Sequence, residues 1–414
     1  MEDLVSRLSC RFCGAPLTEI FVDLGSSPLA NSYLEPEDLG RAEAFYPLAV
    51  YTCGECLLVQ LPEAERPEAI FSDYAYFSSF SDSWLRHAEA YAVAMIDRFG
   101  FGTGHQVIEI ASNDGYLLRW FKDRGVPVLG VEPAGNVAQA AVAAGIPTVV
   151  KFFGVATARE LVAEGKRADL LVGNNVLAHV PDLNDFVAGL AILLAPAGVL
   201  TMEFPHLLRL MAEDQFDTIY HEHYSYFSFA TVRRVFAAHG LTLFDVEELP
   251  THGGSLRIYA RHEDASKLVG ERVADLLARE EAAGLGRLET YRSFGERVRR
   301  VKWGLLRFLI SSKEEGKSIA GYGAPAKGNT LLNYCGVRTD FLDYTVDRSP
   351  HKQGRFLPGT RIPIHGPDRL RETRPDYVLI LPWNLKEEIV EQMADVRSWG
   401  GRFVVAIPEV RVLE

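Results

Sequence analysis

Short apolar runs alternate with amphipathic stretches through the middle of the chain. Residues 107–110 (VIEI) and 128–131 (VLGV) are two such runs, and the segment between them is amphipathic. Buried strands of a parallel sheet appear in a sequence as continuous apolar runs, whereas a helix that covers a sheet is apolar along one stripe. The pattern therefore predicts a strand, turn, helix and strand that open an α/β domain.

The same alternation continues further along the chain. Residues 169–172 and 199–204 are again apolar, and residues 183–194 between them have the pattern of a helix. In doubly wound α/β sheets, ligands bind outside the carboxyl ends of the strands. We therefore expect a ligand site at that edge, close to the pair of asparagines that follows residue 172.

A second α/β pattern lies near the C-terminus. The segment KSIAGYGAPAKGNTLLNYCG predicts a strand that ends at Ala320, a glycine turn and a helix after Pro325. Amide groups at such a helix start, together with Lys327, can bind a phosphate. Residues 270–315 have Arg, Glu and Leu at helical spacing and predict one or two long connecting helices. An α/β domain that binds nothing is the alternative.

Four of the five cysteines form two C-x-x-C pairs near the start of the chain, Cys10 with Cys13 and Cys53 with Cys56. Two such pairs supply the four thiolates of a tetrahedral zinc site. Because sulfur would take every coordination position, we expect a structural zinc and not a catalytic one. A redox C-x-x-C motif and four unrelated buried cysteines are the alternatives.

Composition restricts the class of protein further. The chain has 414 residues and a net charge of −12, which argues against general nucleic-acid binding, because phosphate recognition depends on Lys and Arg. The first residues are too polar for a signal peptide, and no apolar run is long enough to cross a bilayer. We expect a cytoplasmic monomer with neither a nucleic-acid nor a membrane partner.

The turn after the first predicted strand, EIASNDGYL, holds a single glycine, Gly115. A dinucleotide site needs two or three glycines there, because the backbone must approach a pyrophosphate closely. S-adenosylmethionine has no pyrophosphate, so the single glycine favours this cofactor over NAD. Glu132 follows about 20 residues later, where nucleoside-binding folds hold ribose hydroxyls. A turn without a ligand is the alternative.

The segment YHEHYSYFS, residues 220–228, concentrates proton-transfer groups. His223 can be neutral and basic at pH 7, and Glu222 can accept a hydrogen bond from a hydroxyl or an amine. Tyr220 or Tyr224 can donate to an oxyanion. In a strand, successive side chains would point to opposite faces, so we expect a loop. A zinc site and a purely structural loop are the alternatives.

Taken together, these motifs resemble the sugar C-methyltransferase family that acts on nucleotide-linked deoxysugars. The resemblance covers nearly the whole chain and is carried by the two C-x-x-C pairs and by YAYFSSFSDSW, EIASNDGYLL, GVEP, NNVLAHVPDLNDF, EFPH, YHEHYSYFS, GGSLRIYA and GYGAPAKGNTLLN. It implies a zinc-binding module over residues 1–70, an S-adenosylmethionine-binding methyltransferase domain over residues 71–265, and a second Rossmann-like α/β domain over residues 266–414 that completes a nucleotide-sugar site.

The resemblance also implies a reaction, which is methylation of C3 of a nucleotide-linked 4-keto-deoxysugar. It does not name the nucleotide, for which we expect dTDP. The implied catalytic residues are His223 as the base, Glu222, Tyr220, His179 and Tyr76. The implied cofactor-binding residues are Glu109, Ala111, Asn113, Gly115, Glu132, Pro133, Asn174 and Asn175. The implied substrate-binding residues are Tyr74, Ser78, Ser79, Tyr322, Gly323, Ala324, Lys327, Asn329, Trp383 and Asn384.

Two other classes of function fit parts of the sequence. An NAD-dependent oxidoreductase or epimerase of nucleotide-sugars would use the same acid–base groups, but it should have more glycines in the first turn. A zinc-ribbon adaptor would need neither the histidines nor the tyrosines of residues 220–228.

Overall fold

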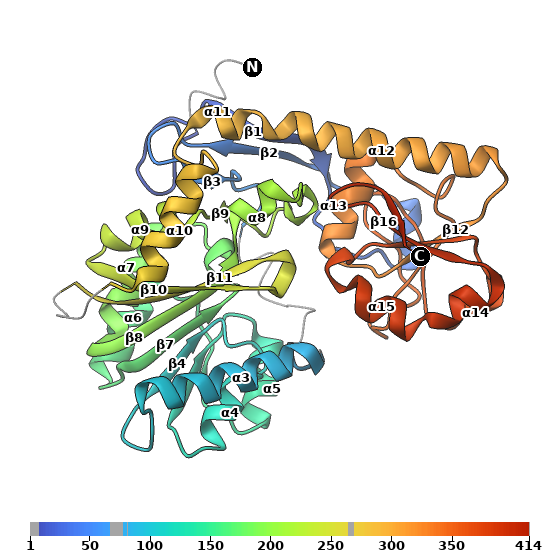
Figure 1. Ribbon diagram of the computed structural model, residues 1–414. Helices are drawn as coiled ribbons and strands as arrows, with labels where there is room; N and C mark the ends of the chain where they lie inside the picture. The colour runs from blue at the N-terminus through green and yellow to red at the C-terminus, as the bar shows by residue number, and fades with distance from the viewer. Residues whose placement is uncertain (1–7, 67–77, 81, 264–268, 414) are drawn as a thin grey trace.

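The computed structural model describes residues 8–66, 78–80, 82–263 and 269–413, and every structural statement concerns these residues. Their strands form three sheets, and the long helix α12 (Phe294–Glu314) extends from the first sheet to the third (Figure 1). In these ranges no helix is both long and apolar enough to cross a membrane. The expected boundaries after residues 70 and 265 lie outside the described residues, so they stay predictions.

The first sheet joins distant parts of the chain in the order β1-β2-β3-β9. Its strands are β1 (Glu19–Ser27), β2 (Tyr46–Thr52), β3 (Val59–Gln60) and β9 (Ser225–Tyr226), with the 3₁₀ helix η1 (Pro36–Gly40) between β1 and β2. The pairing of β9 with β3 is antiparallel and sets Val59 opposite Tyr226. The proton-transfer segment is therefore attached to the N-terminal sheet by backbone hydrogen bonds.

The central sheet has the order β10-β11-β8-β7-β4-β5-β6, and β10 and β11 run antiparallel to their neighbours. Its strands are β4 (Val107–Ile110), β5 (Val128–Val131), β6 (Thr148–Val149), β7 (Ala168–Asn174), β8 (Leu194–Pro205), β10 (Leu241–Leu249) and β11 (Ser255–His262). The predictions for β4 and β5 are confirmed to the residue. β7 and β8 are longer than predicted, because residues up to Asn174 and from Leu194 also pair in the sheet.

Helices surround the central sheet, and α3 lies along one of its faces (Figure 1). They are α3 (Asp82–Phe99), α4 (Leu118–Lys122), α5 (Gly135–Ala143), α6 (Val155–Ala163), α7 (Leu183–Leu193) and α9 (Phe229–Ala237), with the 3₁₀ helices η2 (Ser78–Phe80), η3 (Leu177–His179) and η5 (Thr251–Gly253). The helix α8 (Leu207–Ala212) and the 3₁₀ helix η4 (Phe216–Thr218) instead pack in the core shared by the first and third sheets. The predicted helix over residues 183–194 is confirmed as α7, which ends one residue earlier because Leu194 begins β8.

The third sheet has the order β14-β13-β12-β15-β16-β17 and is parallel apart from β17. This is the 3-2-1-4-5-6 strand order of the Rossmann fold, and it confirms the expected second α/β unit. Its strands are β12 (Ile319–Tyr322), β13 (Thr345–Val346), β14 (Ile364–His365), β15 (Tyr377–Ile380), β16 (Arg402–Val405) and β17 (Arg411–Leu413). β12 continues past Ala320, where we predicted its end, because Gly321 and Tyr322 pair with β13 and β15.

The helices of the C-terminal region differ in number from the prediction. They are α10 (Glu271–Ala282), α11 (Leu288–Arg292), α12, α13 (Ala326–Cys335), α14 (Asp368–Thr373) and α15 (Lys386–Gln392), with the 3₁₀ helices η6 (Trp383–Leu385) and η7 (Ala394–Trp399). Residues 270–315 thus form three helices in the described part of the chain instead of one or two. The break between α10 and α11 contains Gly284, whose φ of +84° is not compatible with a continued helix.

One hydrophobic core joins the first and third sheets. The rings of Phe21 on β1 and Phe294 on α12 stack with their centroids 4.5 Å apart. Further along α12, Leu305 and Leu309 are fully buried in the same core as Ile319 of β12. The N-terminal sheet and the C-terminal domain are therefore packed as one body, while the central sheet has its own core.

The contact between α6 and α7 requires a glycine at residue 189. A Cβ atom there would lie 2.7 Å from the backbone carbonyl carbon of Gly154. We expect Gly189→Ala to lower the midpoint of thermal unfolding, because relieving this overlap costs about 1–3 kcal/mol. Gly135→Ala is the matched control, since a Cβ atom at Gly135 meets nothing within 4 Å. Equal midpoints for the two variants, measured by circular dichroism, would contradict this account of the helix contact.

Candidate active site

The four N-terminal cysteines meet in one cluster. Their Sγ atoms all lie within 4.8 Å of one another, with 3.6 Å between Cys10 and Cys56 and 3.5 Å between Cys13 and Cys53. Thiolates that surround a tetrahedral zinc at about 2.3 Å lie about 3.8 Å apart. The donor set therefore fits zinc, and an ion held there links the two C-x-x-C loops without an open coordination position.

The segment over residues 220–224 is a loop, as predicted, and β9 begins directly after it. Two backbone contacts hold this loop in place. The N–H of Tyr224 donates to the carbonyl oxygen of Ala178 at 2.7 Å, and the N–H of Leu61 donates to the carbonyl oxygen of Tyr224 at 3.0 Å. The loop is thus fixed between η3 and the N-terminal sheet, which brings His223 next to His179.

The imidazole of His223 is oriented by the backbone. Its Nδ1 lies 2.8 Å from the carbonyl oxygen of Thr218. Because a carbonyl only accepts, Nδ1 carries the proton, and Nε2 of the neutral ring keeps its lone pair. Desolvation lowers the pKa of His223 well below its ordinary value, and the neighbouring His179 lowers it further. The ring is therefore neutral at pH 7, with Nε2 as its basic atom.

Two predicted catalytic residues lie against this imidazole. The ring of His179 is 4.7 Å from that of His223, and the ring of Tyr220 is 4.0 Å from it, measured between centroids. Burial lowers the pKa of His179 to about 4, although a hydrogen bond with the backbone of Glu222 opposes this. His179 is therefore a neutral side chain at pH 7. Three of the predicted catalytic side chains are brought together here.

The other histidine and the second tyrosine of the segment face away from this group. Nε2 of His221 lies 3.2 Å from the carbonyl oxygen of Pro47 on β2, and its ring contacts Tyr46 edge-on. Tyr224 is completely buried, with the guanidinium of Arg11 5.4 Å from the centroid of its ring. Of the two tyrosines that could donate to an oxyanion, Tyr220 is therefore the one beside His223.

A side chain of the N-terminal region forms a hydrogen bond with Glu222. It is 3% exposed, and Nδ2 of Asn31 donates to its Oε1 at 2.6 Å. The sequence analysis missed Asn31, which lies 191 positions earlier and belongs to none of the motifs that were recognised. No local pattern could have identified it, because only the position of the segment between β1 and β2 brings it to Glu222.

The turn after β4 has an unusual backbone, as expected for a ligand-binding turn. Ala111, Asn113 and Gly115 have φ values of +57°, +50° and +77°. Such left-handed residues cluster where function requires strain. Glu132 at the end of β5 holds the turn, because its two carboxylate oxygens accept the N–H groups of Asn113 and Ala134, each at 2.9 Å. Pro133 lies between these contacts.

Asn174 gives the clearest sign of a polar ligand at this edge. It ends β7 and is 8% exposed, and neither its Oδ1 nor its Nδ2 has a hydrogen-bond partner among the described residues. A buried amide without partners is ready to bind a polar group. Together with the turn after β4 it fits the nucleoside and amino-acid parts of S-adenosylmethionine. Glu109 of the adjacent strand β4 is fully buried, and its contact with the cofactor stays a prediction.

Asn175 and two residues that the sequence analysis did not single out adjoin this edge. Asn175 has a φ of +53°, and its Nδ2 lies 3.1 Å from Nε2 of His252, whose φ is +55°. The ring of Trp84 meets His252 edge-on at 5.4 Å and stacks on Tyr116 at 5.9 Å. Aromatic rings therefore lie beside Asn175 at this edge of the central sheet.

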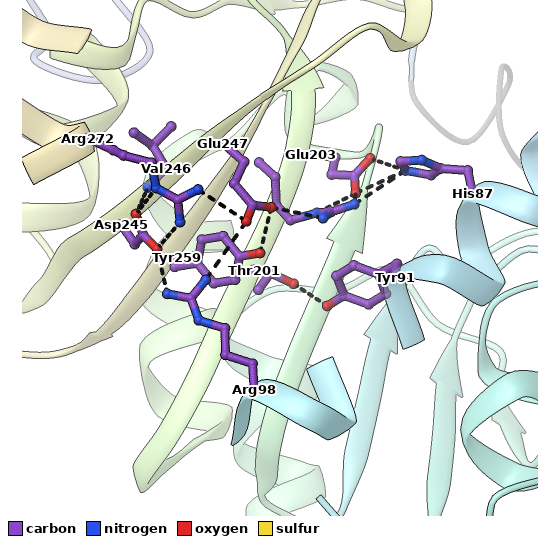
Figure 2. A network of polar contacts seen from close by, with 11 residues as sticks. His87, Tyr91, Arg98, Thr201, Glu203, Asp245, Val246, Glu247, Tyr259 and Arg272 are labelled. Carbon is purple, nitrogen blue, oxygen red and sulfur yellow. Dashed lines mark hydrogen bonds and ion pairs between the residues drawn. The ribbon is translucent and has the colours of Figure 1, made fainter. Parts of the chain in front are cut away.

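A buried ionic network supports the loop that carries Asn175 (Figure 2). Glu203 at the end of β8 is 2.9 Å from Nε2 of His87 and accepts Nε of Arg257 at 2.7 Å, and its backbone oxygen accepts the N–H of Asn175 at 2.8 Å. Burial opposes ionisation, yet hydrogen bonding to His87 and the charge of Arg257 hold the pKa of Glu203 below its ordinary value. The carboxylate stays charged at pH 7. Arg257 also binds Glu247 at 3.0 Å, which extends the network to the outer strands.

The C-terminal domain contributes a cation. Nζ of Lys327 donates to Oδ1 of Asn384 at 2.8 Å and lies 4.7 Å from the ring of Trp383. Nε1 of Trp383 donates to Oδ2 of Asp217 at 2.7 Å, and burial raises the pKa of Asp217 to about 6. The positive charge of Lys327 is a smaller cause of the low pKa of His223 than desolvation and the neighbouring His179. Lys327 therefore belongs to the same site as His223 of the segment 220–228.

Three other predicted substrate residues are engaged differently than expected. The N–H of Ala324 donates to Oδ2 of Asp347 at 2.8 Å, so the turn at Gly323 does not offer this amide to a phosphate. Nδ2 of Asn329 donates to the carbonyl oxygen of Ala30 at 2.6 Å and is buried. Tyr322 is 5% exposed within β12. Of the groups in the predicted anion site, the Ala324 amide therefore has a protein acceptor, and Lys327 supplies the positive charge.

The predicted residues that precede the central sheet divide into two groups. The N–H groups of Ser78 and Ser79 donate to Oδ1 of Asn113 at 2.9 Å and to Oδ2 of Asp114 at 3.1 Å. They therefore contact the turn after β4. Tyr74 and Tyr76 lie outside the described residues.

Three family models match consecutive parts of the chain. Residues 10–71 match a zinc binding domain, residues 84–246 a methyltransferase domain, and residues 250–408 a C-methyltransferase C-terminal domain. The chain is also similar to the C-methyltransferase NovU of Streptomyces niveus, with 37% identity over 414 residues that cover 100% of this chain and 99% of the relative.

Solved structures resemble the chain only in part. The magnesium protoporphyrin IX methyltransferase of Synechocystis PCC 6803 with bound S-adenosylmethionine has a TM-score of 0.32 and 16% identity, covering 43% of this chain and 77% of its own. An S-adenosylmethionine-dependent methyltransferase of Mesorhizobium loti has a TM-score of 0.33 and 16% identity, covering 42% of this chain and 98% of its own.

The cysteine cluster predicts a metal content that can be measured. We expect the purified protein to hold about one zinc per chain, and Cys56→Ser to lose most of it and to unfold at lower temperature. Cys335→Ala is the matched control, because Cys335 is a buried cysteine outside the cluster. Atomic emission measures the zinc. A Cys56→Ser protein with undiminished zinc would show that the cluster is not the binding site.

Proposed function

The chain belongs to the C-methyltransferase family, and from this premise we propose that it methylates C3 of a nucleotide-linked 4-keto-deoxysugar, with dTDP as the carrier. S-adenosylmethionine is the methyl donor, and when bound it supplies a methyl group that is already electrophilic. A sugar carbon is not nucleophilic by itself. The residues of this chain therefore have to generate the nucleophile.

The observation that carries the proposal is the orientation of His223. Its Nδ1 is committed to the carbonyl oxygen of Thr218 at 2.8 Å, and its pKa is held low by desolvation and by His179. Nε2 is thus the basic atom of a neutral, desolvated imidazole, as removal of a proton next to a ketone requires. Nε2 takes the proton from C3, the electron pair of the broken bond forms the enolate, and the charge collects on the C4 oxygen.

The enolate oxygen needs hydrogen-bond donors, because a developing negative charge is costly in a desolvated site. We assign this role to the hydroxyl of Tyr220, whose ring lies on His223, and to the neutral imidazole of His179. The electron pair of the enolate then forms the new bond from C3 to the methyl carbon, and the thioether departs with the electron pair of the old bond. The proton on His223 returns to solvent.

The remaining groups of the candidate active site bind the substrate in this proposal. Glu222 accepts a hydrogen bond from a hydroxyl or an amine of the sugar. Lys327 attracts the phosphates of the carrier, with Trp383 and Asn384 holding its ammonium group in place. The alternative of an NAD-dependent oxidoreductase is disfavoured, because the turn after β4 has one glycine and the surrounding residues match a methyltransferase domain. That the protein is a cytoplasmic monomer stays a prediction from the sequence.

The reaction itself is tested by label transfer. We expect the methyl group of isotope-labelled S-adenosylmethionine to appear on a sugar carbon when the enzyme is given a panel of nucleotide-linked 4-keto-6-deoxysugars, as read by mass spectrometry. In deuterated water, substrate without cofactor should exchange its C3 proton, because the base acts before the methyl group is transferred. Binding of the cofactor with no labelled product from any sugar would contradict the proposed acceptor.

The role of His223 predicts a mutational effect and a pH profile. His223→Ala should lower kcat by about 10²- to 10⁴-fold, the usual contribution of a general base, while the Kd of the cofactor stays unchanged. Because the pKa of His223 lies well below its ordinary value, the base stays unprotonated as pH falls, and the acid limb of kcat/KM should lie below pH 6.5. A limb at or above pH 6.5 would argue against a desolvated histidine base.

The second histidine of the motif supplies the control. His221 faces Pro47 and Tyr46 of the N-terminal sheet, so His221→Asn should retain most turnover even where the protein is less stable. If His221→Asn and His223→Ala lose activity equally, the assignment of the base to His223 is wrong.

A further inference from the structure

The segment between β1 and β2 leaves the N-terminal sheet and lies against the C-terminal domain. Leu34 and Phe356 exchange backbone hydrogen bonds of 3.0 and 2.9 Å, and the N–H of Gly359 donates to Oε1 of Glu43 at 2.7 Å. We call this segment, residues 28–45, the crossing arm. Its backbone is fixed on the C-terminal domain by these contacts and not by the sheet from which it starts.

The crossing arm brings polar side chains to the candidate active site. Nδ2 of Asn31 donates to Oε1 of Glu222 at 2.6 Å. Tyr33 follows Asn31 by two residues on the crossing arm. Its hydroxyl donates to the carbonyl oxygen of Ala324 at 2.5 Å and lies 3.5 Å from Oδ1 of Asn31. Nζ of Lys352 lies 5.3 Å from the ring of Tyr33. Asn31 is thus placed by the C-terminal domain and contacts the motif.

We propose that Asn31 is a positioning residue for Glu222, so that the crossing arm of the N-terminal region completes the substrate site. The amide of Asn31 holds Oε1 and thereby fixes the plane of the carboxylate relative to the sugar. This inference rests on the proposed function, in which Glu222 accepts a hydrogen bond from the substrate. It gives the N-terminal region a role in the reaction beyond holding zinc.

The chemistry of the contact supports a role in positioning. A side-chain amide that donates to a carboxyl oxygen at 2.6 Å restricts the rotation of that carboxyl group. A glutamate has rotatable bonds that a substrate would otherwise have to freeze on binding. With Glu222 buried and held by a residue of another segment, its carboxylate is oriented before the substrate arrives.

A double-mutant cycle separates positioning from a general structural effect. The variants Asn31→Ala, Glu222→Gln and the combination of both are compared on a nucleotide-linked sugar that the wild-type enzyme methylates. We expect Asn31→Ala to lower kcat/KM by about 10- to 100-fold, as for loss of a hydrogen bond to a charged group, with the Kd of S-adenosylmethionine by calorimetry unchanged. The double variant should be no worse than Glu222→Gln alone, because Asn31 acts only through Glu222. Losses that multiply in the double variant would overturn the inference.

Two further variants keep the test decisive if Asn31→Ala does not fold. Asn31→Asp has the same shape but lacks the amide donor and places a second carboxylate against Glu222, so it should lose activity at neutral pH at least as severely as Asn31→Ala. Ser32→Ala is the matched control on the exposed neighbouring position and should turn over like wild type. Wild-type activity in Asn31→Asp would overturn the inference.

The outcomes also separate this inference from the proposed function. If the wild-type enzyme is active on a nucleotide-linked sugar and the Asn31 variants match it, only the role of Asn31 is wrong. If the wild-type enzyme methylates no such sugar, the proposed function fails and the inference fails with it.

Discussion

The pairing of β9 with β3 is the contact on which the arrangement of the site depends. The antiparallel register sets Val59 opposite Tyr226, and a slip of one residue would exchange the two faces of the strand. This register, together with the backbone contacts of Tyr224, decides that His221 faces β2 while His223 faces His179. The position of His223 beside His179, and of His221 against β2, thus depends on a strand pairing between segments far apart in the sequence.

The N-terminal region does more than carry a zinc site. Its sheet shares a core with the C-terminal domain through α12, its cysteines pack in the core of the central sheet, and its crossing arm reaches Glu222. The candidate site is therefore assembled from three parts, each with its own chemistry. The central sheet offers the buried amide of Asn174, which has no hydrogen-bond partner among the described residues. The loop before β9 offers the neutral imidazole of His223, and the C-terminal domain offers Lys327.

Electrostatics divides the site into a neutral part and a charged part. Desolvation lowers the pKa of His179 and His223, so both imidazoles are uncharged at pH 7. Glu203 near the end of β8 is charged instead, because His87 and Arg257 keep its carboxylate ionised although it is buried. Buried charges are thus paired with opposite charges in the scaffold, whereas the buried imidazoles of His179 and His223 are neutral.

The sequence by itself determined what depends on neighbours along the chain. Burial patterns located β4 and β5 to the residue, C-x-x-C spacing gave the zinc ligands, alternation of the motif predicted its loop, and the single glycine of the first turn favoured S-adenosylmethionine. Only the tertiary structure decided which side chains meet. It placed Asn31 on Glu222, turned Tyr224 against Arg11 and gave the Ala324 amide to Asp347. These contacts join segments of different sheets, and their geometry follows from strand register and from packing between domains, which no local pattern records.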